Sequence, residues 1–310
     1  MVNITHDPIF SVFRRFEGEI PVGFTVDFLG GIRRERLPLS IELPAGGGVV
    51  QATGVMPLPD EEYFEWIDLL ESARAASGSF TMLELGAGWG RWGVAGVLAA
   101  RQCGIDTIRI GLVEAEPIHV ELMRVYLSDN QIPSDIVDIF EGVISEDPGE
   151  AYFLVRKSVT SKVESDGGYE WWGQSKLPAD SQPVAVAKGA YANRDLLIFG
   201  NGRAAVVVPQ FQASKLIRKY PLIDLIDMDL QGEEFVVIYG AMEALNDRAK
   251  RLHIGTHSPE IERDLRALLA ANKWECLRDY GCLKTNATPY GEHYFQDGVQ
   301  TWINPRLSSR

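Results

Sequence analysis

LELGAGWGRWG, residues 83–93, joins an apolar strand pattern to a helical pattern through a run of glycines. Glycine adopts the backbone conformations of tight turns and lets a ligand approach the main chain closely. The N-terminus of the helix that follows offers unpaired N–H groups to a polar ligand. This stretch therefore predicts a strand–turn–helix unit with a ligand lying across the turn.

Two classes of ligand fit this turn. Gly88, Gly90 and Gly93 satisfy the dinucleotide pattern G-x-G-x-x-G, whereas Glu84 and Gly86 extend it to E-x-G-x-G-x-G. An acid directly before the glycines repels a pyrophosphate but attracts the ammonium and sulfonium groups of S-adenosylmethionine. Glu84 therefore favours S-adenosylmethionine over NAD. A plain β–α turn without a ligand is the third alternative.

A second acidic position follows at the end of the next strand pattern. TIRIGLVEAEP, residues 107–117, places Glu114 and Glu116 where a carboxylate can accept hydrogen bonds from both hydroxyls of a ribose. Either glutamate fits this role. NAD sites use such an acid too, so this position does not discriminate between the two cofactors.

Strand and helix patterns alternate outward from this unit. Strands are expected at 80–90, 107–117, 135–145, 222–230, 251–258, 275–280 and 299–305. Helices are expected at 59–76, 91–104, 118–131, 233–247 and 259–274. This order predicts the α/β class, with a doubly wound, mostly parallel, Rossmann-like sheet of seven strands.

Two regions depart from the alternation. Residues 1–58 are rich in Gly and Pro with short apolar runs, which predicts an N-terminal β-rich cap and leaves 59–310 for the main domain. Residues 151–220 interrupt the pattern with a polar, aromatic and glycine-bearing stretch. We expect an insertion there, on the substrate side of the sheet.

The insertion carries the aromatic segment GGYEWWGQS, residues 167–175. Trp171 and Trp172 can stack on the C–H faces of a carbohydrate or macrocyclic acceptor, while polar neighbours bind its hydroxyls. Anchoring of the insertion onto the sheet is the alternative role. We expect one tryptophan to contact substrate and the other to anchor, without assigning which.

The amino-acid composition limits which binding partners and which cellular compartment we expect. A net charge of -13 and a pI near 4.9 disfavour nucleic acid, which needs clustered Lys and Arg. Cys103, Cys276 and Cys282 show no metal or disulfide spacing, which favours a reducing cytoplasm. No segment approaches the ~20 apolar residues of a membrane span. We therefore expect a cytoplasmic protein that binds a small molecule and neither nucleic acid nor membrane.

Several segments together resemble the FkbM family of class I S-adenosylmethionine-dependent methyltransferases. Residues 83–93 resemble its first motif, and EAEP at 114–117 resembles its E-P-x-P. DNQI at 129–132 and FEGVISEDPGEAYF at 140–153 are similar to its N-g-i segment and the following strand pair. LIDLIDMDLQGEEFVVIYGA at 222–241 resembles its i-K-i-D-v-E-G-a-E-x-x-v-l-x-G-a.

The resemblance covers most of residues 80–305 and implies S-adenosylmethionine as cofactor. It implies an O-methyltransferase acting on a hydroxyl of a small molecule, of sugar or polyketide type, and places Glu114 on the ribose. The implied cofactor-binding residues are Glu84, Gly86, Ala87, Gly88, Gly90, Glu114, Gly142 and Val143. An NAD-dependent oxidoreductase and a non-catalytic scaffold that retains the fold are the alternatives.

The segment 222–241 also departs from the family pattern. Asp227 stands where the family has Lys, and Gln231 replaces its Glu, which removes a carboxylate. Asp229, Gly232 and Glu234 match the pattern.

Two residues are candidates for the catalytic base. Asp229 and His257 each lie at the carboxyl end of a predicted strand, at the crevice where open α/β sheets bind ligands. Either side chain can accept a hydroxyl proton. Asp227 is expected to be solvated or salt-bridged, and His253, inside its strand, to be a hydrogen-bonded core histidine.

The acids after Asp229 have two possible roles. Glu233 and Glu234 fall in the first turn of the next predicted helix, where negative charge is favourable, so at least one is expected to be structural. Hard cations take carboxylate ligands, so Asp229, Glu233 and His257 also form a candidate site for a divalent cation. No spacing in the sequence requires such a cation.

Overall fold

A seven-stranded sheet forms the centre of the computed structural model, which describes residues 6–37, 42, 47–155, 175–178 and 180–308. Its strands are β5 (Ser79–Leu85), β6 (Thr107–Glu114), β7 (Val137–Glu141), β13 (Leu225–Met228), β14 (Arg251–Thr256), β15 (Glu275–Tyr280) and β18 (Gly298–Ile303). The strand order is β15-β18-β14-β13-β5-β6-β7, and β18 alone runs antiparallel to its neighbours. The predicted doubly wound, mostly parallel sheet of seven strands is confirmed.

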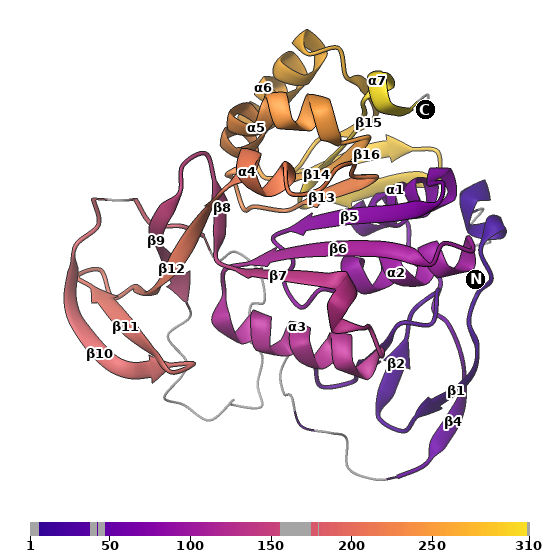
Figure 1. Ribbon diagram of the computed structural model, residues 1–310, viewed down its shortest axis with the longest axis horizontal. Coiled ribbons are helices and arrows are strands. Elements are labelled where there is room, and N and C mark those ends of the chain that lie inside the picture. Colours follow the sequence, from indigo (N-terminus) through magenta and orange to yellow (C-terminus); the bar gives the residue numbers. More distant parts are fainter. Residues whose placement is uncertain (1–5, 38–41, 43–46, 156–174, 179, 309–310) are drawn as a thin grey trace.

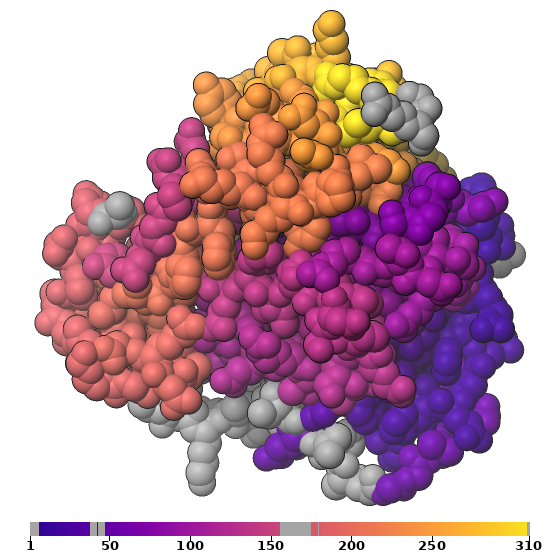
Figure 2. All heavy atoms as spheres, in the orientation of Figure 1, coloured from indigo at the N-terminus to yellow at the C-terminus, as the bar shows by residue number. Residues whose placement is uncertain are grey.

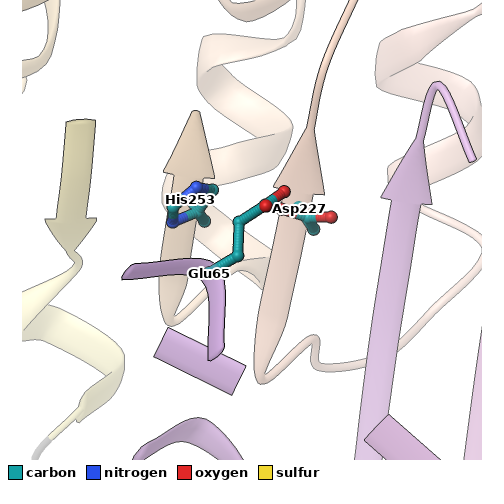
Figure 3. A group of neighbouring side chains, drawn as sticks. All are labelled: Glu65, Asp227 and His253. Carbon is teal, nitrogen blue, oxygen red and sulfur yellow. The ribbon is translucent and has the colours of Figure 1, made fainter. Parts of the chain in front are cut away.

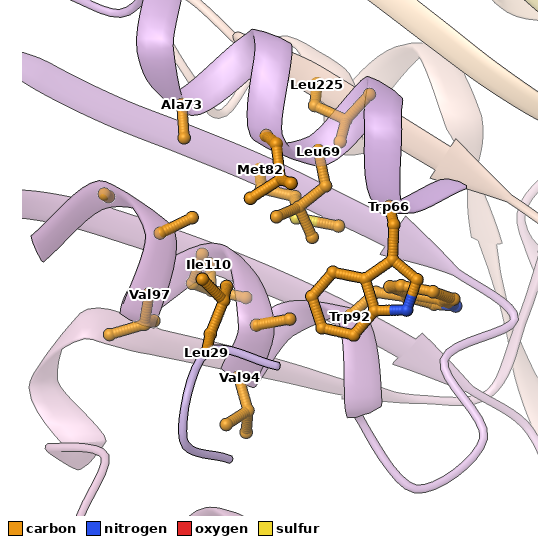
Figure 4. Packing of buried hydrophobic residues seen from close by; sticks show 14 of the residues in the cluster. Leu29, Trp66, Leu69, Ala73, Met82, Trp92, Val94, Val97, Ile110 and Leu225 are labelled. Carbon is orange, nitrogen blue, oxygen red and sulfur yellow. The ribbon is translucent and has the colours of Figure 1, made fainter. Parts of the chain in front are cut away.

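Helices cover both faces of this sheet (Figure 1). The helices of the two faces are α1 (Glu61–Ala75), α2 (Arg91–Gln102) and α3 (Pro117–Asp129), then α4 (Ala213–Ile217), α5 (Glu234–Arg248) and α6 (Pro259–Ala271). Each set supplies its own hydrophobic cluster against the strands. Figure 4 shows Trp66 of α1 beside Trp92 of α2, and Leu69 of α1 close to Met82 of β5. The Trp66 and Trp92 rings are 5.2 Å apart in an edge-to-face arrangement.

Helix starts show where the site lies. Asp60, Glu116 and Ser258 cap α1, α3 and α6 by accepting hydrogen bonds from main-chain N–H groups. The helix α2 differs, because it begins at Gly90 in the left-handed conformation (φ 78°) with no side-chain cap from that residue. Its N-terminus therefore faces the end of β5 with N–H groups available to other partners.

The strands β5 and β13 mark the switch point of the sheet. The chain leaves β5 toward β6 on one side and leaves β13 toward β14 on the other. Open α/β sheets bind ligands at such a point. The register pairs Glu84 with Asp227, and Asp227 with His253, so three polar residues lie side by side across neighbouring strands.

A second sheet protrudes beside the carboxyl ends of the main strands (Figures 1 and 2). It contains β8 (Val143–Ser145), β9 (Gly149–Val155), β10 (Pro183–Tyr191), β11 (Arg194–Phe199) and β12 (Ala204–Gln212). The single strand expected at 135–145 is wrong, because β7 and β8 separate at Gly142 and join different sheets. A Cβ on Gly142 would lie 2.3 Å from the carbonyl oxygen of Pro209, so only glycine allows this approach to β12.

Smaller elements complete the chain. These are η1 (Pro8–Val12), β1 (Glu17–Pro21), β2 (Phe24–Val26), β3 (Ile32–Arg34), β4 (Val49–Thr53), η2 (Ser134–Ile136), β16 (Lys284–Thr288), β17 (Gly291–Phe295) and α7 (Pro305–Ser308). Strands β1 and β4 pair with each other, as do β2 and β3, and Phe10 and Phe28 pack into the same cluster as α1. The division at residue 58 and the bounds of the insertion stay predictions.

The closest backbone approach in the switch point is between Gly86 and Asp229. Gly86 has φ 87°, and a Cβ there would lie 1.8 Å from the carbonyl oxygen of Asp229. Gly88 also has positive φ, 53°, but a Cβ there would meet nothing within 4 Å. The two glycines therefore differ in packing and not in the sign of φ.

We expect Gly86→Ala to be far more destabilising than Gly88→Ala. In both variants a non-glycine residue in the left-handed conformation lowers the free energy of unfolding by about 1–2 kcal/mol. Only Gly86→Ala also overpacks its surroundings, which lowers it by about 1–3 kcal/mol more. Urea unfolding followed by circular dichroism measures the difference. Equal losses for the two variants would show that β13 is not held against the turn.

Candidate active site

A cleft of about 810 Å³ opens at the carboxyl ends of β5, β6, β13 and β14. The predicted cofactor residues that line it are Glu84, Gly86, Ala87, Gly88, Glu114, Gly142 and Val143. Gly90 is not part of its wall; a Cβ there would lie 3.0 Å from Cγ of Met123, so this glycine serves the packing of α2 on α3. The structure thus brings together seven of the eight positions implied by the resemblance.

Glu84 lies beneath the N-terminus of α2. Its Oε2 accepts a hydrogen bond from the Gly93 N–H at 2.7 Å, which provides the cap that Gly90 lacks. A Cβ on Gly93 would lie 2.7 Å from a methyl group of Leu112, so glycine is needed there for close helix–strand packing. Burial raises the pKa of Glu84 well above its usual value, and the neighbouring Asp227 carboxylate adds to this effect.

The two candidate ribose acids have different surroundings. Glu114 accepts hydrogen bonds from the Gly88 N–H (2.6 Å) and the Glu116 N–H (2.7 Å), which hold its carboxylate at the cleft wall. Glu116 is 1% exposed, caps α3 through the His119 N–H and accepts a hydrogen bond from the Tyr191 hydroxyl. Of the two acids, Glu114 alone is part of the wall of the cleft.

Asp229 and His257 lie together at the cleft edge. The Asp229 side chain is 49% exposed, and its Oδ1 lies 3.2 Å from Nε2 of His257. The other ring nitrogen, Nδ1, hydrogen-bonds Oε1 of Glu234 at 2.8 Å. Burial lowers the pKa of His257, but the bonds to Asp229 and Glu234 outweigh it and raise the pKa to about 10. The imidazole is therefore protonated at neutral pH, which favours Asp229 as proton acceptor and His257 as the group that orients it.

The two glutamates that follow have separate partners. Glu234 is fully buried and accepts hydrogen bonds from the N–H groups of Leu230 and Gly232. Glu233 instead forms an ion pair with Lys176 at 3.0 Å. The predicted cation set of Asp229, Glu233 and His257 is therefore corrected, because Glu234 and not Glu233 contacts the histidine.

Asp227 does not have the surroundings that the sequence suggests. It is 5% exposed and lies in the floor of the cleft, so the expectation of a solvated position is wrong. Burial raises its pKa to about 7; the nearby His253 opposes this shift, and Asp229 adds to it. His253 is confirmed as a buried, hydrogen-bonded histidine, with Nδ1 2.7 Å from Oδ2 of Asp68.

Sequence reasoning missed the contribution of α1 to the site. Glu65 lines the cleft, and Asp68 lies behind it, fully buried. The available signal was the interruption of an apolar helix by these two acids, next to Trp66 and Ile67.

The cleft is strongly acidic. Among the described residues, nine Asp or Glu side chains line it, against three Lys or Arg side chains. Arg91 is paired with Glu62 at 2.6 Å, and Lys176 is paired with Glu233. The wall therefore carries an excess of negative charge.

The second sheet supplies one wall of the cleft. Val143 and Phe153 come from β8 and β9, and Ser175 and Lys176 follow the undescribed part of the chain. The predicted substrate contacts Trp171 and Trp172 lie outside the described residues.

Comparisons with known proteins bear on the fold and the class. No model of a known protein family matches the chain. A protein from Jannaschia sp. (strain CCS1), described as "Putative methyltransferase", is 29% identical over 244 residues, which are 78% of this chain and 79% of that protein.

Two solved structures overlap the chain in part. Methyltransferase FkbM from Methylobacillus flagellatus KT has 13% identity and a TM-score of 0.44, covering 74% of this chain and 44% of that chain. The chain thus spans less than half the length of that protein. The O-methyltransferase from Bacillus cereus in complex with SAH has 12% identity and a TM-score of 0.40, and the match covers 80% of this chain and 82% of that chain. The strand order, with β18 alone reversed, by itself defines a class I, Rossmann-like methyltransferase fold.

No helix in the described part of the chain has the length and apolar character needed to cross a membrane.

We expect Asp227→Asn to stabilise the protein in a pH-dependent way. The folded-state pKa of Asp227, about 7, exceeds the unfolded value of about 3.9, so the wild type loses stability as pH rises through this window. Asparagine cannot ionise. The variant should match the wild type near pH 4 and exceed it at pH 8 by about 2–4 kcal/mol. Urea unfolding at several pH values, with a chelator present, measures this, and parallel curves would contradict it.

Proposed function

We propose that the chain is an S-adenosylmethionine-dependent O-methyltransferase of the FkbM type, acting on a hydroxyl of a small molecule. The observation that carries this proposal is the acidic cleft around the glycine turn, with nine carboxylates against three basic side chains. Such a wall attracts the ammonium and sulfonium groups of this donor. The sequence relative described as a methyltransferase supports the same class.

The cleft suits this donor better than a dinucleotide. A pyrophosphate across the turn would lie against Glu84, and repulsion would oppose it. Glu114 projects a carboxylate beside Gly88, where two ribose hydroxyls can donate hydrogen bonds to it. Burial and neighbouring acids raise the pKa of Glu84, so a cationic ligand would relieve the repulsion at this position.

The chemistry assigned to the chain is positioning and proton acceptance. The donor supplies an electrophilic methyl group on sulfur, and the sulfur keeps the bonding electron pair as a thioether when the hydroxyl oxygen takes the methyl. Asp229 accepts the hydroxyl proton, and His257 holds that carboxylate in place at 3.2 Å. Glu234 fixes the histidine from its other side. Orientation and exclusion of water by the cleft supply most of the rate.

A sugar or polyketide-type acceptor fits the wall opposite the turn. Phe153 offers an aromatic face for C–H groups, and Lys176 and Ser175 offer donors for hydroxyls. The segment 222–241 supports the FkbM type, because its Glu234 accepts hydrogen bonds from the Gly232 N–H and from the ring of His257. A screen of hydroxylated acceptors with a labelled methyl donor identifies the substrate.

We expect Glu114→Ala to weaken S-adenosylmethionine binding by at least tenfold, because charge-assisted hydrogen bonds are worth about 1.5–3 kcal/mol each. Glu116→Ala is the matched control; it removes the cap of α3 and should lower thermal stability more than affinity. Calorimetry with S-adenosylmethionine and, separately, with NAD makes the measurement. Binding of NAD alone would identify an oxidoreductase, and binding of neither would favour a scaffold.

We expect Asp229→Asn to lower turnover by about 10²–10⁴-fold while donor affinity changes little, because the proton acceptor is lost. His257→Asn should cost less, since it removes only the orienting contact. The pKa of His257 is raised to about 10, so the wild-type rate should not fall as pH drops through 6.5. A rate that halves near pH 6.5 would instead identify a neutral histidine as the base.

A further inference from the structure

A second cluster of chemically active side chains lies in the floor of the cleft. Glu65 of α1, Asp227 of β13 and His253 of β14 converge there (Figure 3). One potential ligand atom from each lies within 4.8 Å of the others. All three side chains line the cleft, and none belongs to the Asp229–His257 pair.

Partners behind the cluster set the orientation of His253. Its Nδ1 lies 2.7 Å from Oδ2 of Asp68, a carboxylate that also receives hydrogen bonds from Arg251 and Arg278 and from the hydroxyl of Thr301. An ionised carboxylate only accepts, so Nδ1 carries a proton, and in the neutral ring Nε2 then keeps its lone pair. The carboxylate–histidine pair is the arrangement that orients histidine ligands of metals.

The ionisation of Asp68 supports this tautomer. Burial raises the pKa of Asp68, but the hydrogen bond from His253 and the charges of Arg278 and Arg251 outweigh burial, so the pKa is lowered overall. The donors around Asp68, from His253, Arg251, Arg278 and Thr301, likewise fit an ionised carboxylate.

The two carboxylates of the cluster have only a remote balancing charge, because Arg91, which lowers the pKa of Glu65, is itself paired with Glu62. Neither Asp227 nor Glu65 forms an ion pair with a basic side chain among the residues that the structure describes. Asp227 is only 5% exposed, and it lines the cleft. Burial raises the pKa of Glu65 well above its usual value, and the charge of Asp227 adds to this shift. Three acceptors that face one another require a proton or a cation between them.

We propose that Glu65, Asp227 and His253 bind a divalent transition metal such as Mn²⁺ or Zn²⁺. One imidazole nitrogen with two carboxylates suits these ions better than Ca²⁺, which prefers oxygen alone. Ligand atoms bound to one ion lie at most about 4.0–4.4 Å apart, so the three atoms, now within 4.8 Å of one another, would draw together as the ion binds. Three protein ligands leave positions open toward the cleft, for water or a ligand.

The metal is inferred without reference to the methyl donor, so its test uses metal alone. The full chain is stripped with a chelator, and Mn²⁺ is titrated by calorimetry and electron paramagnetic resonance without S-adenosylmethionine. We expect one saturable site per chain, with the coupling of one imidazole nitrogen in the pulsed spectrum. Absence of saturable binding of both Mn²⁺ and Zn²⁺ at millimolar metal would overturn the proposal.

The Mn²⁺ affinity of variants inside and outside the cluster shows where the ion binds. Asp227→Asn and Glu65→Gln should weaken Mn²⁺ by at least about tenfold, in line with losses of metal ligands and their supports. Two matched controls should retain the wild-type affinity: Glu62→Gln, on the same helix and in the same cleft, and Asp229→Asn, from the other cluster. Circular dichroism verifies that each variant folds. Loss of binding in Asp229→Asn but not in Asp227→Asn would place the ion elsewhere and refute this site.

A ligand ammonium is the competing occupant. Methionine, which carries the same ammonium and carboxylate as the donor, is titrated in parallel. Methionine binding that depends on Asp227, without any Mn²⁺ binding, would assign the cluster to an ammonium group and overturn the metal proposal.

Discussion

The structure depends on a backbone contact between the ends of two neighbouring strands. Gly86, after β5, approaches the carbonyl oxygen of Asp229, after β13, so closely that no side chain fits between them. The Asp229 N–H in turn donates to the carbonyl oxygen of Leu85 at 2.9 Å. This contact places the glycine turn beside the proposed base, and Glu84 pairs with Asp227 two residues earlier along the two strands. The donor-binding and proton-accepting parts of the cleft are thus set by one main-chain arrangement.

The acids in and beside the cleft fall into two groups. Glu84, Glu114 and Glu234 each accept hydrogen bonds from main-chain N–H groups, which stabilise a carboxylate in a fixed position. Glu65 and Asp227 have raised pKa values and no basic partner among the described side chains. The side chains of the first group are held in place by these main-chain hydrogen bonds, whereas Glu65 and Asp227 are the two acids that the proposed cation would bind.

The fold was more predictable from sequence than the site, for physical reasons. Strand and helix periodicity reports which faces are buried, so the seven strands and their order of appearance could be predicted. The glycine turn predicted the cleft because φ above zero and close approach leave a local signature, as at Gly86. Glu65 was missed because its role depends on how α1 packs across the sheet, which no local pattern records. Similarly, the local sequence does not show which of the adjacent residues Glu233 and Glu234 contacts His257, because a shift of one residue along the helix turns the side chain in another direction.

The second sheet has a consequence for how the chain reaches this state during synthesis. Thr81 and Asp224 are joined by a hydrogen bond although 143 residues separate them, and strands β8 to β12 are made in the interval. The strands β5, β6 and β7 can pair with one another as soon as they are synthesised. The other side of β5 has no neighbour until β13 leaves the ribosome. Pairing of such distant segments is slow and leaves an unpaired strand edge exposed in the meantime. The nascent chain thus carries an open edge at β5 for about half of its translation.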